Sequence, residues 1–361
     1  MDLDFGTNKV NINVMNIFDS DYMVGAHSDV LKSIIDTNNL RTSGYGQDEY
    51  TQAARDVILE KCGLSSDNAN IYFFIGGTLT NKVLLDIILE SYQAVISADS
   101  AHIFIQESGA IEALGHKVIA LKGKNGKLSA EVIDEYMKFY LSSQHRIHLV
   151  EPGCVYITQP NELGALYTLL ELKAISDVCK KYNLLLYIDG ARLAYALGSP
   201  KNNVLLKDIA EFADCFYIGG AKCGALMGEA GVIKSSIRKS HFMTNIKRHG
   251  ALFSKGRVVA VQFLALFKDD LYTKIGKIAY STSSMLYDNM KKMGYNFYID
   301  CQSNQNFVIF TPRQIEKFKT KGYDFSIWDN IDGNQITRLI TDWTFTKDDI
   351  DKFLKVAKEC V

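Results

Sequence analysis

Short apolar runs alternate with longer amphipathic segments along the first two thirds of the chain. The short runs are rich in Val, Ile and Leu without strict alternation, which is typical of parallel strands covered on both faces. The predicted strands are 70–74, 94–97, 117–121, 154–158, 184–188, 215–218 and 230–233. Helical periodicity is clearest at 48–62, 80–91, 129–141 and 170–180. This order of elements predicts an α/β fold built on a mostly parallel sheet.

The pattern changes after about residue 245. The elements predicted there are two long consecutive helices, two strands and a closing helix, at 255–267, 270–292, 307–310, 338–340 and 347–360. We therefore expect a large domain at 1–245 and a smaller α+β domain at 246–361. The N-terminal segment is a candidate for packing on the smaller domain.

Composition excludes several classes of protein. The chain has 361 residues, and its 40 Lys and Arg nearly balance 41 Asp and Glu, so no bulk charge attracts nucleic acid or anionic membrane. Neither a signal peptide nor an apolar run of about 20 residues is present. The 7 cysteines lack the spacing of zinc ligands or of a disulfide framework. We expect a soluble cytoplasmic protein with reduced thiols and no metal.

Three residues of complementary chemistry follow two apolar runs. Asp189 and Arg192 come after 184–188, and Lys222 lies among small residues after 215–218. A carboxylate at the carboxyl end of a buried strand sits where open α/β sheets bind ligands. An acid for a pyridine nitrogen and an amine for an aldehyde are the groups that hold pyridoxal phosphate. A helix cap, a surface ion pair and an exposed turn lysine are the respective structural alternatives.

Two further motifs precede these residues. Gly76, Gly77 and Thr78 join a strand to a helix, where glycines and the first helical amides suit a phosphate group. A plain turn with a threonine N-cap is the alternative. His102 follows the strand at 94–97 and is a candidate for stacking on a cofactor ring or relaying a proton, or else a structural histidine.

Together these motifs resemble the threonine aldolase and β-eliminating lyase branch of the fold-type I pyridoxal phosphate enzymes. The matching segments extend over most of the chain and are 18–21, 45–48, 76–81, 101–103, 107–109, 189–193, Lys222 and 338–341. The sequence Asp-Gly-Ala-Arg-Leu at 189–193 with a downstream lysine is the specific part. The resemblance implies a three-layer large domain, a smaller C-terminal domain and a homodimer or homotetramer with shared active sites.

The resemblance also implies how the cofactor is held. Lys222 would bind the aldehyde of pyridoxal phosphate, Asp189 would pair with the ring nitrogen, and His102 would stack over the ring; these are the expected catalytic residues. The other cofactor-binding residues implied are Gly77, Thr78, Gln159 and Arg192. Gln159 is expected near the 3-oxygen of the cofactor.

For the substrate, the resemblance implies an amino acid whose α-carboxylate is held by Ser20, Arg192 and Arg338. The expected reaction is retro-aldol cleavage of a β-hydroxy-α-amino acid of the threonine or phenylserine type, giving glycine and an aldehyde. The base for the β-hydroxyl remains open between His102 and a bound water. A pyridoxal phosphate-dependent β-elimination, giving pyruvate and ammonia, and a catalytically silent cofactor-binding scaffold are the alternatives.

The chain departs from the family pattern at two places. Thr158-Gln159-Pro160-Asn161 stands where the family carries Glu-Asn-Thr-His-Asn, so the histidine implicated there in handling the substrate hydroxyl is missing. The loop at 249–257 corresponds loosely to one that donates a phosphate-binding arginine to a neighbouring subunit, with Lys255 and Arg257 as candidates here.

Overall fold

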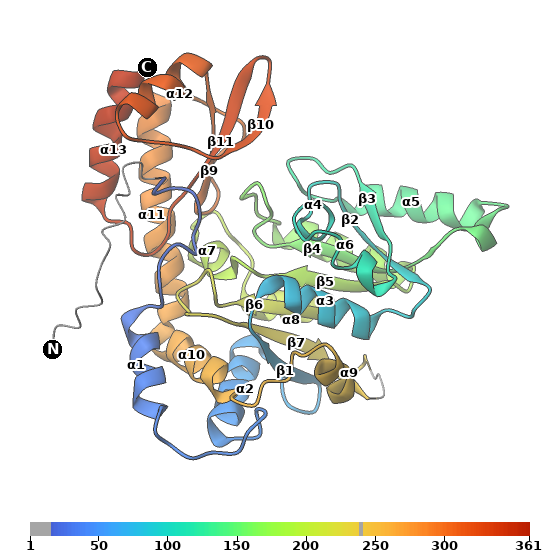
Figure 1. Cartoon of the computed structure of the whole chain (residues 1–361). Coiled ribbons are helices and arrows are strands. Elements are labelled where there is room, and N and C mark those ends of the chain that lie inside the picture. The colour runs from blue at the N-terminus through green and yellow to red at the C-terminus, as the bar shows by residue number, and fades with distance from the viewer. Residues whose placement is uncertain (1–15, 238–240) are drawn as a thin grey trace.

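The computed structural model describes residues 16–237 and 241–361, and it contains two sheets (Figure 1). The larger sheet has seven strands in the order β1-β7-β6-β5-β4-β2-β3. Its strands are β1 (Ala69–Phe74), β2 (Gln93–Ala98), β3 (Val118–Leu121), β4 (Glu151–Thr158), β5 (Leu185–Asp189), β6 (Cys215–Gly219) and β7 (Glu229–Lys234). The pairs from β3 through β6 are parallel, and β7 runs antiparallel to both of its neighbours. The first residues of the predicted large domain, 1–15, lie outside the described residues.

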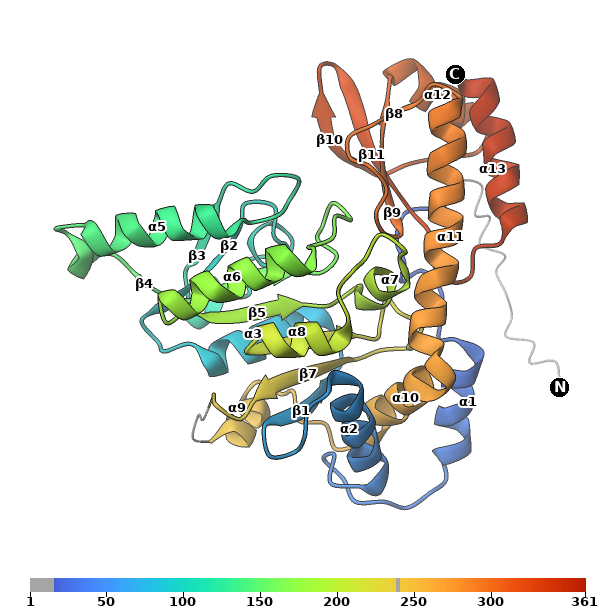
Figure 2. The ribbon, with the colours of Figure 1, turned by 180° about the vertical axis from the view of Figure 1, so that it is seen from behind.

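Helices cover both faces of this sheet. β4 is buried from its second residue onward and β6 along its whole length, because neither strand has a face open to water. α3 (Gly77–Ile88) lies along one face in Figure 1, and Figure 2 shows α6 (Leu169–Lys181) and α8 (Leu206–Phe212) over the other. The predicted α/β fold with a mostly parallel, covered sheet is therefore confirmed.

Polar caps set where several of the helices begin. The Asp48 carboxylate accepts from the Thr51 amide at the start of α2 (Glu49–Cys62), and Thr168 forms a reciprocal capping box with Glu171 at the start of α6. The other helices of this part are α1 (Ser28–Thr37), α4 (His102–Ile105), α5 (Ala130–Ser142), α7 (Leu193–Gly198), α9 (Phe242–Arg248) and α10 (Arg257–Phe267). Short 3₁₀ turns occupy Glu112–Leu114, Arg146–His148 and Lys268–Asp270.

The C-terminal part is built on a four-stranded antiparallel sheet in the order β10-β11-β9-β8. Its elements are α11 (Leu271–Lys292), β8 (Asn296–Phe297), β9 (Gln305–Phe310), α12 (Pro312–Thr320), β10 (Ile327–Ile331), β11 (Asn334–Ile340) and α13 (Lys347–Cys360). Figure 2 shows α11 as the long rod that connects this part to α10, with α13 beside its far end. Within the described residues, no helix combines the length and apolar composition that a membrane span requires.

Two apolar cores meet along α11. Ile275 in its first half belongs to the core around the large sheet, whereas Leu286 and Met290 belong to the core of the C-terminal part. The predicted domain boundary at 245/246 stays a prediction. The change from the core of the large sheet to the core of the C-terminal part occurs within α11. Phe18 also lies in the C-terminal core, with its ring centroid 4.8 Å from that of Phe353.

Candidate active site

Asp189 ends β5 at the carboxyl edge of the large sheet, and four donors surround its carboxylate. Oδ2 accepts from Asn81 Nδ2 at 3.0 Å and from the Tyr156 hydroxyl at 2.5 Å. Oδ1 accepts from the Ala191 amide at 2.9 Å and from the Tyr217 hydroxyl at 2.6 Å. Burial, and secondly the charge of Asp189, raise the pKa of both tyrosines well above its ordinary value, so the phenols remain donors. The carboxylate is thereby fixed in position.

Lys222 lies in the loop between β6 and β7. This loop packs backbone against backbone: a Cβ added at Gly219 would overlap the carbonyl of Ala191, so only glycine fits there. Burial, and secondly the positive charge of Arg192, lower the pKa of the Lys222 amine from its ordinary value. Among the described residues, no hydrogen bond or ion pair engages this amine. A buried amine with a lowered pKa is suited to attack a carbonyl carbon.

His102 is linked to Asp189 by a chain of hydrogen bonds. Its Nδ1 lies 2.7 Å from Glu107 Oε1, and Asn81 Nδ2 donates to the same oxygen at 2.8 Å. Asn81 Nδ2 also donates to Asp189, which completes the chain. Because a carboxylate accepts, Nδ1 is the donor of the histidine pair and Nε2 is left for a ligand. The chain orients the imidazole relative to the Asp189 carboxylate.

The N-terminus of α3 has no side-chain cap. Gly76 is the N-cap residue in an extended conformation, so the predicted alternative of a threonine N-cap is not what the structure contains. The Thr80 hydroxyl instead donates to the Gly76 carbonyl at 2.9 Å. The first amides of the helix therefore remain available to an anion beside Gly77 and Thr78.

Arg192 makes a two-point ion pair with a carboxylate of the protein itself. Its Nε donates to Asp21 Oδ2 at 2.7 Å and its Nη2 donates to Asp21 Oδ1 at 3.0 Å. Asn304 Nδ2 also donates to Asp21 Oδ2, at 2.9 Å. Although burial opposes it, the attraction of Arg192 helps to hold the pKa of Asp21 below its ordinary value. Both members of the pair are buried, which makes this a fixed feature of the fold.

Arg338 interacts with the charges of this pair, and Ser20 directly precedes Asp21 in the chain. The Arg338 guanidinium stacks over the ring of Trp328, 4.9 Å from its centroid. Burial, and secondly the charge of Arg192, lower the pKa of Arg338 to about 10. The hydroxyl of Ser20 is buried without a hydrogen-bond partner among the described residues. The guanidinium groups of Arg192 and Arg338 thus both interact with the Asp21 carboxylate.

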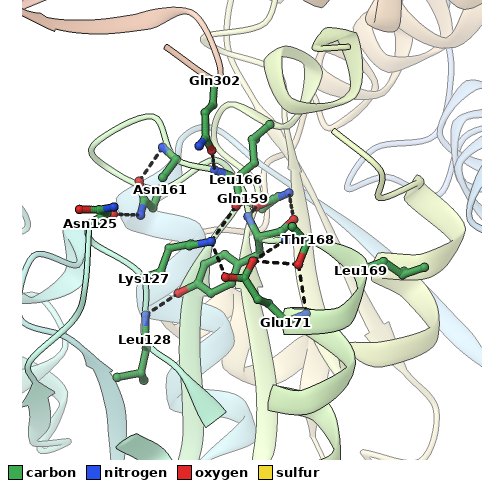
Figure 3. Close-up of polar contacts among 12 residues, drawn as sticks. Asn125, Lys127, Leu128, Gln159, Asn161, Leu166, Thr168, Leu169, Glu171 and Gln302 are labelled. Carbon is green, nitrogen blue, oxygen red and sulfur yellow. Dashed lines mark hydrogen bonds and ion pairs between the residues drawn. The ribbon is translucent and has the colours of Figure 1, made fainter. Parts of the chain in front are cut away.

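Gln159 has a different environment from the one the resemblance implies. Its side chain is fully buried, with Oε1 accepting from the Tyr167 amide at 2.8 Å and Nε2 donating to the Tyr167 carbonyl at 3.1 Å (Figure 3). The amide therefore holds the loop after β4 together, and this geometry does not support a direct contact with a cofactor ring.

One cavity of about 360 Å³ brings most of the predicted residues together, a size typical of small-molecule sites. It is lined by Tyr22, Gly77, Thr78, His102, Gln106, Glu107, Thr158, Pro160, Asn161, Glu162, Asp189, Ala191, Arg192, Tyr217, Lys222 and Glu229. The lining does not include Ser20, Gln159 or Arg338. The cavity therefore joins an amine, a helix N-terminus, an imidazole and several carboxylates.

Two of the carboxylates that line the cavity were not predicted from the sequence. Glu162 lies just after β4 and Glu229 opens β7, where burial raises the pKa of Glu229 to about 8. The Glu229 carboxylate accepts from the Gly220 amide at 2.9 Å. The predicted strands 154–158 and 230–233 stopped short of both glutamates. An acidic residue at the edge of a buried strand was the available signal.

Comparison with known proteins gives a consistent result. A family model described as "Beta-eliminating lyase" matches residues 32–311. A low specificity L-threonine aldolase of Pseudomonas aeruginosa is 27% identical over 349 residues, covering 95% of this chain and 96% of the relative. A low specificity L-threonine aldolase of a Pseudomonas species is 28% identical over 314 residues, covering 85% and 88%. The structure of a Leishmania major threonine aldolase is 36% identical with a TM-score of 0.90, covering 95% and 98%. As the resemblance predicted, the chain belongs to the beta-eliminating lyase family.

Proposed function

We propose that this protein is a pyridoxal 5′-phosphate-dependent lyase that cleaves a β-hydroxy-α-amino acid to glycine and an aldehyde. The observation that carries the proposal is the convergence of Lys222, Asp189, His102 and the α3 N-terminus on one cavity. Relatives that are named threonine aldolases support a substrate of the threonine type, and we propose phenylserine as a further substrate of the same class. Nothing in the cavity favours β-elimination over aldol cleavage.

The donor set around the cavity fits pyridoxal phosphate. The uncapped amides at Gly77 and Thr78 suit the phosphate, the Lys222 amine suits the aldehyde, and the Asp189 carboxylate suits the protonated ring nitrogen. When bound, the cofactor supplies an electron sink for the bond that breaks at Cα. His102 would lie against the ring, oriented by its bond to Glu107.

The charges around Arg192 favour an amino-acid carboxylate. The positive charges of the buried Arg192 and the half-buried Arg338 both interact with the buried carboxylate of Asp21. An excess of buried positive charge is stabilised when a second carboxylate binds. The free hydroxyl of Ser20 is a further donor for that group. We propose these residues as the site of the substrate α-carboxylate, with Arg192 as the member that lines the cavity.

A second copy of the chain would complete the mouth of the cavity. Several large apolar side chains are exposed within three residues of the cavity lining: Tyr22, Ile75, Phe104, Ile105, Leu226 and Met227. Clustered exposed apolar residues are typical of protein interfaces. We propose a homodimer or homotetramer with shared active sites, in which Lys255 or Arg257 reaches a neighbouring phosphate.

A reducing compartment suits the chain. All seven cysteines, which are Cys62, Cys154, Cys179, Cys215, Cys223, Cys301 and Cys360, are free and buried. Persistent free thiols are typical of cytoplasmic proteins, and we propose that location.

The visible absorbance spectrum with pyridoxal phosphate tests the assignment. We expect a yellow band from the cofactor attached to Lys222, which shifts to longer wavelength when glycine is added. Lys222→Ala should lack the attached cofactor, as judged by the mass of the protein after borohydride reduction. A wild-type protein without the yellow band would contradict the assignment of Lys222.

A further inference from the structure

The cavity holds acidic side chains with different surroundings. Asp189 already accepts four hydrogen bonds, which matches the acceptor capacity of a carboxylate. Glu107 bonds to His102 and Asn81 through Oε1 alone, and its Oε2 is buried without a partner among the described residues. Glu229 is held by the Gly220 amide next to Lys222. The reaction described so far gives no role to Glu162 or to Glu229, and Glu162 is the one that is bonded to the His102 amide.

The carboxyl of Glu162 is held on one side only. Its Oε1 accepts from the Thr158 hydroxyl at 2.9 Å and from the His102 amide at 2.9 Å. Among the described residues, no donor is bonded to Oε2, and the residue lines the cavity although it is only 6% exposed. One oxygen therefore fixes the carboxyl in place, while the other remains for a ligand in the cavity.

The turn that carries Glu162 is rigidly supported. Asn161 Nδ2 donates to the Asn125 carbonyl at 2.8 Å, and Asn161 Oδ1 accepts from the Ala165 amide at 2.9 Å (Figure 3). The Leu166 amide donates to Gln302 Oε1 at 2.8 Å, and Lys127 Nζ donates to the Leu166 carbonyl at 3.1 Å. A side chain held by packed and hydrogen-bonded neighbours is pre-organised for proton transfer.

The surroundings of Glu162 also favour its protonated form. Burial raises the pKa of its carboxyl above the ordinary value, against the opposing effect of its hydrogen bonds. Such a carboxyl can accept a proton that an exposed glutamate would release. The neighbouring Asn161 cannot act in this way, because an amide does not titrate and its groups are engaged in the turn.

We propose that Glu162 is a catalytic residue that accepts the proton of the substrate β-hydroxyl when the Cα–Cβ bond breaks. This inference rests on the proposed function. The O–H bond breaks and its proton passes to Oε2, while its electron pair forms the C=O bond of the aldehyde. The Cα–Cβ electron pair stays on Cα. Since Cα of glycine then gains one proton, Glu162 returns the one that it took and no further reactant is needed.

Glu162→Gln tests this role, because glutamine keeps the shape and the accepting oxygen that binds Thr158 and His102. We expect unchanged affinity for pyridoxal phosphate and an unchanged spectral response to glycine, which has no β-hydroxyl. The kcat for threonine or phenylserine should fall by about 100-fold or more, as expected for loss of a general base. Glu151→Gln, at the exposed first residue of β4, should retain wild-type kcat.

The protein without cofactor gives an independent readout. Because the pKa of Glu162 is raised on folding, its stabilising effect is full at low pH and is lost as the pH rises. The free energy of unfolding of wild type should therefore fall relative to that of Glu162→Gln as the pH rises above the ordinary pKa of a glutamate. A difference that stays constant as the pH rises would contradict a proton-accepting carboxyl.

Two outcomes overturn the proposal directly: a Glu162→Gln variant that cleaves within threefold of wild type, or one that loses its affinity for the cofactor. A wild-type protein that binds the cofactor and glycine but cleaves no β-hydroxy amino acid would sink the proposed function, and this inference with it. Measuring the cleavage of threonine or phenylserine by wild type distinguishes failure of the proposed function from the two outcomes for Glu162→Gln.

Discussion

Asp21 and Arg192, 171 positions apart in the sequence, form a buried two-point ion pair with N–O distances of 2.7 and 3.0 Å. The pair joins the N-terminal segment, whose Phe18 packs in the C-terminal core, to the loop that follows β5. Asn304 completes the connection by donating to Asp21. The surroundings of Arg192, which lines the cavity, are thereby built from three distant segments of the chain.

Breaking this pair should be costly. Asp21→Asn leaves Arg192 buried without its ion-pair partner, and we expect a loss of about 3–5 kcal/mol in the free energy of unfolding. Urea unfolding of the cofactor-free protein at pH 7 measures it. The exposed pair of Lys32 and Asp36 is the matched control, since Asp36→Asn should cost no more than about 1 kcal/mol. Equal losses in the two variants would contradict the structural role of Asp21.

Glu229 should give the stability of the protein a characteristic pH dependence. Burial raises its pKa from 4.5 to about 8, so the folded state favours the protonated form. Its stabilising effect is therefore complete below about pH 4.5 and is lost as the pH rises through about 8. Relative to that of Glu229→Gln, the free energy of unfolding of wild type should fall by up to about 1.4 kcal/mol per pH unit across this range. A difference in the free energy of unfolding between the two proteins that stays constant across this pH range would contradict the raised pKa.

The close packing beneath Asp189 should not tolerate a methyl group. A Cβ at Gly190 would overlap the carbonyl oxygen of Tyr217, and backbone cannot move aside as a flexible side chain can. Gly190→Ala should destabilise the fold by about 3 kcal/mol or more, measured as a shift of the urea midpoint at constant slope. At Gly25 an added Cβ meets no atom within 4 Å, so Gly25→Ala should change stability by less than about 1 kcal/mol. Similar shifts in both variants would show that the packing is looser than described.

The sequence predicted the layered fold well because buried parallel strands read as uninterrupted apolar runs. The strand predicted at 215–218 lies within β6, and the closing helix predicted at 347–360 coincides with α13. Short elements such as α4 and β8 were missed, because four or fewer residues carry no measurable periodicity. Their existence depends on contacts between distant segments.

The site was predictable where residue type and strand end coincide, as at Asp189 and Lys222. It was not predictable where a contact is made across the chain. No local pattern indicates that Asp21 forms an ion pair with Arg192, or that Asn81 donates hydrogen bonds to both Glu107 and Asp189. Nor does any local pattern indicate that the side chain of Gln159 bonds to the backbone of Tyr167; a role of Gln159 near the cofactor stays a prediction.

Product analysis tests the central claim most directly. Purified protein loaded with pyridoxal phosphate is incubated with L-threonine or phenylserine, and glycine, aldehyde, pyruvate and ammonia are quantified for wild type and Lys222→Ala. We expect equal amounts of glycine and aldehyde from wild type and neither from Lys222→Ala. Pyruvate and ammonia as the products, or cleavage that persists in Lys222→Ala, would contradict it.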